Sequence, residues 1–299
     1  FLCFFLYMKV LSCNFYIIKN LHLQSIKKIL VGIAFSPNLK PNIFEAVRLA
    51  NMFEAQLVGV HVGEKTVKKE QQLSQLISEA PILKLPVKTV WQKGKPVDII
   101  LKTSVEENID LLILGALQQE NLYKYYVGSV ARELTRKANC SVLLLIKPSI
   151  ERVKCNHIVV NGLKDKKTIE TIQASFLVSK ALACKRITIV EEISQKEIEV
   201  IVSDDHSLRK ATIEKEKLKR REDSRVHKIL ETIDTKGVSI KIQSIFGKRG
   251  YSIGHYAKVK RADLLVMNAP SKTTILDRIF PHDIEYILTE LPTDVLIVK

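Results

Sequence analysis

The sequence is poor in the features that build disulfide scaffolds and metal centres. Its 299 residues include five cysteines and seven histidines, and neither set shows paired or metal-ligand spacing. An odd set of unpaired cysteines is typical of a reducing compartment, so we expect a cytoplasmic protein. We expect no bound metal for the same reason. The cysteines are Cys3, Cys13, Cys140, Cys155 and Cys184.

A convincing membrane span is also lacking. The apolar stretch of residues 1–18 is interrupted by Lys9 and is short and rich in aromatic residues. It has no basic leader before its apolar run and no small-residue cleavage site. We therefore expect residues 1–25 to be an extension outside the fold, with translation starting at Met8 or later. A packing extension and a membrane or export signal are the alternatives, and no membrane partner is expected.

No segment concentrates the charge. The formal net charge of +15 arises from 47 Lys+Arg against 32 Asp+Glu and is spread over the whole chain. The most basic stretch, about 207–233, interleaves its cations with Glu214, Glu216 and Glu222 and offers no aromatic residues for base stacking. We interpret it as a solvated helix with i,i+4 ion pairs. Nucleic acid is not the expected partner, and binding of a polyanion is kept as an alternative.

What the sequence does contain is an internal repeat. Residues 87–145 align without a gap on residues 240–298, 153 positions downstream. The identities fall in a glycine turn and in two buried strand patterns, so one fold is expected twice. The identical pairs include Gly94/Gly247, Asp110/Asp263, Leu112/Leu265 and Leu143/Leu296.

Apolar runs alternate with helical patterns along each copy. This alternation predicts parallel βαβ units with right-handed crossovers, hence an α/β protein with two doubly wound five-stranded parallel-sheet domains in tandem. We expect domain 1 over residues 26–148 and domain 2 over residues 153–299. The expected strands lie at 27–33, 56–62, 87–91, 111–114 and 141–146, and then at 157–160, 186–190, 263–267 and 295–298, with the repeat placing 87–91 on 240–244.

One loop of the first copy has features of a phosphate site. Ligands of a doubly wound sheet lie beyond the carboxyl ends of its strands, and Gly115 lies at such an end. Gly128 and Ser129 fall where a helix begins, and free N–H groups there favour an anion. Ser129 either caps this helix or donates to a phosphate, and a simple glycine turn with a serine N-cap is the structural alternative.

The second copy has lost this pattern. Asn268 and Ser271 replace both loop glycines, and Pro281 has no backbone N–H to offer an anion. We expect no ATP site there, and we interpret His282 and Asp283 as ordinary helix capping.

The whole pattern resembles the universal stress protein family, from about residue 28 to residue 299. That family's nucleotide loop reads Gly-x-x-Gly, nine residues, Gly-Ser/Thr, after a buried strand. The resemblance implies an adenine nucleotide alpha hydrolase-like fold, with ATP or AMP as ligand. It implies phosphate and ribose contacts from Leu114, Gly115, Gly128, Ser129 and Val130.

Two positions depart from the family pattern. Gln118 stands in place of the second loop glycine, and Ala34 replaces the aspartate that holds the nucleoside. Losing a hydrogen bond that involves a charged group weakens binding by roughly ten- to a hundredfold. Occupancy of this site by cellular ATP therefore stays open.

Three function classes follow. The leading hypothesis is a tandem universal stress protein that regulates the stress response by sensing a nucleotide and is not an enzyme. The second is an interaction scaffold without nucleotide, whose halves pair as an internal pseudo-dimer through strands 141–146 and 295–298, with homodimerisation as a further option. The third is slow ATP hydrolysis, for which the sequence offers no Walker lysine, metal-binding carboxylate near the loop or nucleophile–base pair.

Overall fold

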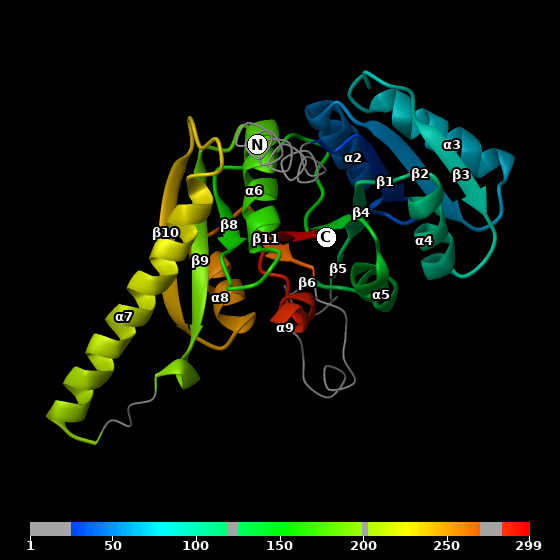
Figure 1. The fold of residues 1–299 in the computed structure, drawn as a ribbon. Coiled ribbons are helices and arrows are strands. Elements are labelled where there is room, and N and C mark those ends of the chain that lie inside the picture. Colours follow the sequence, from blue (N-terminus) through cyan, green and yellow to red (C-terminus); the bar gives the residue numbers. More distant parts are fainter. Residues whose placement is uncertain (1–24, 119–124, 199–202, 270–282) are drawn as a thin grey trace, which may run out of the picture.

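A computed structural model gives the fold of the chain (Figure 1). It describes residues 25–118, 125–198, 203–269 and 283–299. The predictions about residues 1–24, Ser271, Pro281 and His282 lie outside these ranges, as does the prediction about the side chain of Gln118. No helix in the described ranges is long and apolar enough to cross a membrane.

The first half of the chain alternates strands and helices as expected. Each predicted strand is present, with ends that differ by at most one residue from the prediction. In chain order the elements are β1 (Lys28–Gly32), α2 (Leu39–Phe53), β2 (Gln56–Val62), α3 (Val67–Glu79), β3 (Lys88–Gln92), α4 (Pro96–Glu106), β4 (Leu111–Gly115), the short β5 (Leu117–Gln118) and β6 (Tyr125–Tyr126), α5 (Ser129–Lys137) and β7 (Ser141–Leu145).

The second half repeats this order, and its second strand, second helix and third strand are longer than those of the first half. The strand predicted at 186–190 continues to Ser194, because the polar residues that follow its apolar run are themselves buried. The elements are β8 (Ile158–Asn161), α6 (Thr168–Leu182), β9 (Arg186–Ser194), η2 (Gln195–Glu197), α7 (Asp205–Leu230), β10 (Ser239–Gly247), α8 (Tyr251–Val259), β11 (Leu264–Asn268), α9 (Asp283–Thr289) and β12 (Asp294–Val298).

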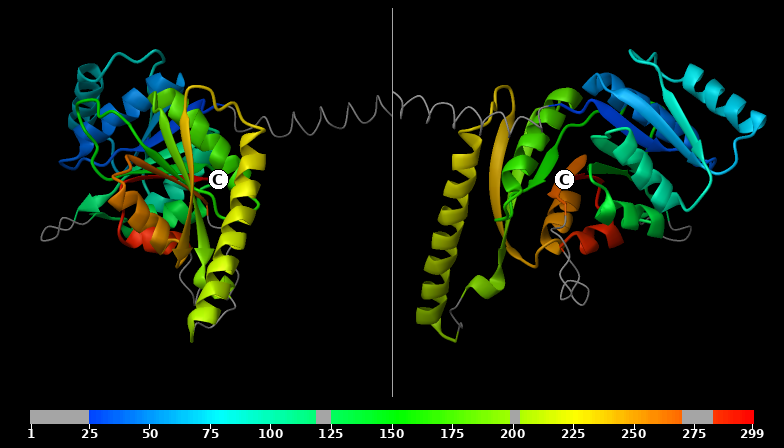
Figure 2. Two further views of the ribbon diagram at one scale, coloured as in Figure 1. Left: turned by 90° about the vertical axis from the view of Figure 1, so that its left-hand side faces the viewer. Right: turned by 45° about the vertical axis from the view of Figure 1, so that its right-hand side comes forward.

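The main strands form one ten-stranded sheet in the order β10-β9-β8-β11-β12-β7-β4-β1-β2-β3. Each half has the same internal order, and all neighbours are parallel except β7 and β12, which are antiparallel. Helices cover both faces of the sheet (Figure 2). One hydrophobic layer lies under α2, α3, α6 and α7, and the other lies under α4, α5, α8 and α9.

The seam between the halves has local two-fold symmetry. Leu143 pairs with Leu296, its own repeat equivalent, so the axis passes through this pair. On either side, Ile146 N donates to Asp294 Oδ1 (2.8 Å) and Lys299 N donates to Ser141 Oγ (3.3 Å). An interface in which equivalent residues meet is the arrangement of a two-fold dimer. The strand pairing predicted between 141–146 and 295–298 is therefore confirmed.

The repeated aspartates have the same role in both halves. Asp110 Oδ2 accepts from the amides of Lys27 and Lys28 at the start of β1. Asp263 Oδ2 accepts from two successive amides at the start of β8, at 2.7 and 2.9 Å. Each carboxylate thus ties its own strand to the neighbouring one, which explains why the sequence repeats an acid directly before an apolar strand.

Candidate functional site

A cavity of about 490 Å³ opens at the carboxyl ends of β1, β2 and β4. Residues from α2 and from the starts of α4 and α5 complete its wall. This is the position at which a doubly wound sheet holds a ligand. Four of the five predicted site residues line it, namely Leu114, Gly115, Gly128 and Val130.

Ser129, the fifth predicted residue, is not among the residues that line the cavity. It is the exposed first residue of α5, while Gly128 occupies the N-cap position with φ −60° and ψ 160° and no side-chain cap. Of the alternatives left open for Ser129, the helix cap is therefore excluded, and a contact with a phosphate stays a prediction. The first hydrogen bond inside the helix runs from Arg132 N to Gly128 O (2.9 Å). The backbone amides of residues 129–131 therefore have no acceptor inside the helix and lie at its N-terminus.

Gly115 lets an asparagine approach the end of β4. A Cβ at position 115 would lie 3.2 Å from both amide atoms of Asn42 on α2. The Oδ1 atom of Asn42 is buried and has no hydrogen-bond partner in the described part of the chain. Both residues line the cavity, so this side chain offers an unpaired acceptor beside it.

Three aromatic rings gather at the ends of the first three strands. His61 contacts Phe35 and Trp91 edge-on, with ring centroids 4.9 and 5.0 Å apart, and Phe35 stacks on Trp91 at 6.2 Å. Phe35 and His61 line the cavity. The wall of the cavity therefore includes aromatic side chains, which suit a planar ring.

Hydrogen bonds fix the orientation of the His61 ring. Its Nδ1–H donates to the Ile33 carbonyl oxygen (2.9 Å), which can only accept. Nε2 then accepts from Lys69 Nζ at 3.2 Å. Lys69 also lies 5.5 Å from the Phe35 ring centroid, so this ammonium brings positive charge to the rim of the aromatic cluster.

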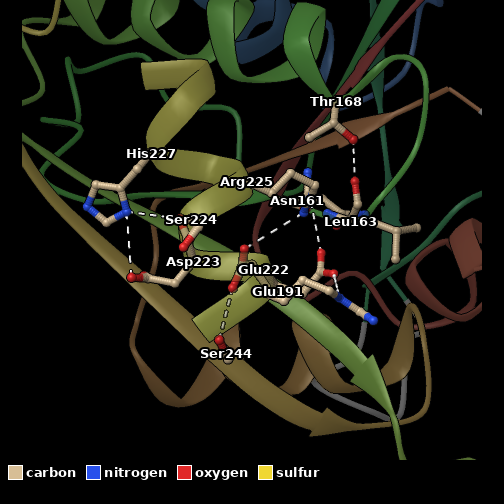
Figure 3. A network of polar contacts seen from close by, with 12 residues as sticks. Asn161, Leu163, Thr168, Glu191, Glu222, Asp223, Ser224, Arg225, His227 and Ser244 are labelled. Carbon is tan, nitrogen blue, oxygen red and sulfur yellow. Dashed lines mark hydrogen bonds and ion pairs between the residues drawn. The ribbon is translucent and has the colours of Figure 1, made fainter. Parts of the chain in front are cut away.

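A second cavity, of about 630 Å³, lies at the ends of β8 and β9. The sheet register relates it to the first one: His61 on β2 pairs with Trp91 on β3, and Glu191 on β9 pairs with Ser244 on β10. In Figure 3 the side chains of Glu191 and Ser244 meet there. An aromatic pair in one half thus corresponds to a hydrogen-bonded polar pair in the other.

Charged side chains fill the rest of this second region. Arg225 on α7 donates to Glu222 Oε2 (2.8 Å) and to the carbonyl oxygen of Gly162. Glu222 also binds Arg221 and is only 6% exposed, so it is not the solvated residue that the sequence suggested. Burial raises the pKa of Glu191 to about 7, although Ser244 and Arg225 act in the opposite direction.

Sequence reasoning missed Asn42, Phe35, His61 and Trp91. They come from four separate elements or loops, and no local motif connects them. One signal was present: His61 lies next to the last residue of a buried strand, and the rule that singled out Gly115 applies equally there. Among the described residues, no group of three or more histidine, cysteine or acidic side chains could hold a metal ion.

Comparisons with known proteins agree with this fold. The model of the Universal stress protein family matches residues 25–145, which contain the whole first cavity. None of the curated proteins matches the chain.

Solved structures share the fold over nearly the entire chain. A universal stress protein from Archaeoglobus fulgidus DSM 4304 is 16% identical with a TM-score of 0.66, and the alignment covers 91% of this chain and 98% of that one. A functionally unknown protein from Pseudomonas aeruginosa PAO1 gives the same identity and TM-score, with coverage of 93% and 94%. At this identity the likeness concerns the fold, and it extends over both halves.

Proposed function

Because the chain belongs to the universal stress protein family through residues 25–145, we propose that it is a tandem member that senses an adenine nucleotide. The first half, over residues 26–148, would bind ATP or AMP, and the second half, over residues 153–299, would not. The protein would act as a stress-response regulator in the cytoplasm and not as an enzyme. Cys140, Cys155 and Cys184, which are free thiols in the structure, support a reducing compartment.

The first cavity carries this proposal, since its parts match the parts of a nucleotide. The aromatic surface of Phe35 and His61 suits the base. The unpaired Oδ1 of Asn42 would accept from a hydroxyl or amine of the nucleoside. The amides that open α5 suit the phosphates, because a helix start favours an anion.

The corresponding region of the second half lacks these parts. Asn268 stands at the last position of β11, where β4 has Gly115, and it donates to Asp165 Oδ1 (3.4 Å). Leu163 follows β8 at the position where Ala34 follows β1. The Glu191 and Glu222 carboxylates would repel a polyphosphate, so this half would exclude ATP.

Calorimetric titration with ATP and AMP tests the proposal. We expect one nucleotide per chain. We expect Gly128→Asp to weaken ATP binding about a hundredfold, because it places a negative charge at the start of α5. Aspartate is a good N-cap residue, so the melting temperature of the variant should not fall. A parent protein that binds neither nucleotide at millimolar concentration would reject nucleotide sensing.

The antiparallel seam favours a second candidate, an interaction scaffold in which the fold itself is the functional part. Arg132 and Arg136 of the first half both bind Glu285 of the second, at 2.9 and 2.6 Å, and extend the contact beyond β7 and β12. The scaffold needs no ligand in either cavity. Purified protein that carries stoichiometric nucleotide would count against it.

A further inference from the structure

The cavity of the second half is lined by charges of both signs in equal number. Its basic residues are Lys164, Arg221, Arg225 and Arg249, and its acidic residues are Glu191, Glu192, Glu197 and Glu222. Most of these have partners of opposite charge or act as helix caps. Glu222 binds both Arg221 and Arg225, and Glu192 accepts from two amides at the start of α8.

Glu191 is only loosely paired, through an ion pair of 3.7 Å with Arg225. It is 1% exposed, and its Oε2 accepts from Ser244 Oγ at 2.9 Å. Its Oε1 has no hydrogen-bond donor in the part of the chain that the structure describes. The nearest cation, Arg225, lies 3.7 Å from this atom and donates to the Gly162 carbonyl instead. A buried carboxylate oxygen without a donor is unfavourable, and a donor group in the adjacent cavity would relieve it.

Two basic residues that line the cavity also have no ion-pair partner among the described residues. Lys164 follows β8, and Arg249 precedes α8. Neither forms a hydrogen bond or an ion pair with any described residue, although both line the cavity and both are exposed. Among the described residues, the cavity therefore combines one buried carboxylate oxygen that lacks a hydrogen-bond donor with two unpaired cations at its rim.

We propose that this second cavity binds a small zwitterion of the α-amino acid class, with the ammonium at Glu191 and the carboxylate at Lys164 and Arg249. A simple anion would meet the Glu191 carboxylate without compensation, and a simple cation would meet the two rim cations. A zwitterion satisfies both sets of groups with neutral overall charge. The site is independent of the nucleotide site, whose corresponding histidine has both ring nitrogens engaged.

A thermal-shift screen of the full chain against each standard amino acid at millimolar concentration tests the proposal. We expect at least one to raise the melting temperature, with saturable calorimetric binding. The amine that lacks its carboxylate and the acid that lacks its ammonium should each bind at least about tenfold more weakly. The proposal would be overturned if no amino acid raised the melting temperature, or if the acid that lacks the ammonium bound as tightly as the amino acid.

Substitutions then locate the site. Glu191→Gln and Lys164→Ala should each weaken the amino acid about tenfold or more. Glu216→Gln on the exposed part of α7 and Lys166→Ala on the same loop as Lys164 are the matched controls and should leave binding unchanged. ATP binding should be the same in all four variants. Loss of amino acid binding can therefore be distinguished from loss of nucleotide sensing. Unchanged amino acid binding in Glu191→Gln would contradict the assignment.

Proton release supplies a readout that a structural role for Glu191 would not give. Burial raises the pKa of Glu191 to about 7, so the residue is partly protonated at neutral pH. A bound ammonium would lower this pKa, and the protein would release a proton in parent but not in Glu191→Gln. Calorimetry at pH 7 in buffers of different ionisation enthalpy measures this release. The charged groups that act on Glu191 are Glu222, Asp223 and Arg225 on α7. Lys164, Glu192 and Arg249 line the same cavity.

Discussion

The two ligand edges of the sheet have the same backbone and opposite chemistry. Strand order and register are repeated, yet the first edge carries aromatic rings and glycines and the second carries buried carboxylates and arginines. At one register position His61 faces Trp91, and at its equivalent Glu191 faces Ser244. The comparison teaches that the fold determines where a ligand lies, while a few side chains at the strand ends determine which ligand it is.

The same contrast extends to the helices that cover these edges. In the first half, Lys69 from α3 reaches the histidine ring. In the second half, the much longer α7 lies along β9 and β10 at the outer edge of the sheet (Figure 1). Arg225 on α7 donates a hydrogen bond to the Gly162 carbonyl oxygen. This oxygen corresponds to that of Ile33, which accepts from His61. One backbone oxygen is thus satisfied in two different ways, and only the first leaves an apolar surface.

The largest expected effect concerns the seam that joins the two halves. Leu144 is fully buried on β7 and pairs with Val295 on β12. Leu144→Ala should lower the free energy of unfolding by about 2–5 kcal/mol, in a single denaturant transition, because the sheet is shared. Leu85→Ala, at a position 43% exposed, should change it by less than about 0.5 kcal/mol. Two unfolding transitions, of which only one shifts to lower denaturant concentration in Leu144→Ala, would show that the halves fold independently.

A smaller effect should appear in the pH dependence of stability. Burial raises the pKa of Asp294 from 3.8 to about 7, so folding favours its protonated form. This stabilisation is present below about pH 4 and is lost as the pH rises through about 7. Asp294→Asn should therefore be more stable than the parent at pH 8, by up to about 4 kcal/mol, with little difference at pH 4.

Denaturant titrations at these two pH values measure that difference. The amide oxygen of the variant can still accept from Ile146 N, so the seam keeps its hydrogen bond. Ser141→Ala, at the equivalent position of the first half, should leave the pH profile unchanged. A parent protein whose unfolding free energy rises between pH 5 and pH 8, with the same slope in Asp294→Asn, would contradict this account.

The aromatic cluster should have a more modest influence on ligand binding. Phe35 is the third residue after β1, and Lys164 is the third residue after β8. Phe35→Ala should weaken ATP and AMP about tenfold, since stacking of a base on an aromatic ring contributes about 1–3 kcal/mol. Lys164→Ala should leave both affinities unchanged. Equal affinities for the parent and Phe35→Ala in a calorimetric titration would show that the base does not stack on the aromatic rings.

Ser129→Ala should have the smallest effect. The hydroxyl lies on the exposed first residue of α5 and not on the wall of the cavity. We expect ATP affinity to fall by no more than about threefold. A loss above tenfold for ATP, with AMP unaffected, would show that the hydroxyl contacts the outer phosphates after all.

The sequence was sufficient for the architecture because the determining signals are local and occur twice. Asp110 and Asp263 precede similar apolar strands, and the paired Leu143 and Leu296 lie at the seam. Strand lengths were less predictable. The acids Glu191 and Glu192 end an apolar run in the sequence, yet both remain inside β9. Ser244 donates to one oxygen of Glu191, and amides at the start of α8 donate to Glu192.

The site was predicted only in part, for a physical reason. Gly115 and Gly128 belong to a short motif with fixed spacing, so the sequence shows them. Asn42 and the aromatic rings meet only after the strands pair, and nothing in their local sequence indicates the contact. Arg225 and Glu191 likewise come from different elements. No sequence motif indicates the cavity to which they contribute.

A crystal structure of the full chain grown with excess ATP tests the central claim most directly. The account predicts electron density for one nucleotide, with its phosphates at the amides that open α5 and its base beside Phe35, and no nucleotide between β9 and α7. A triphosphate in the second half, or an empty first cavity at millimolar ATP, would contradict it.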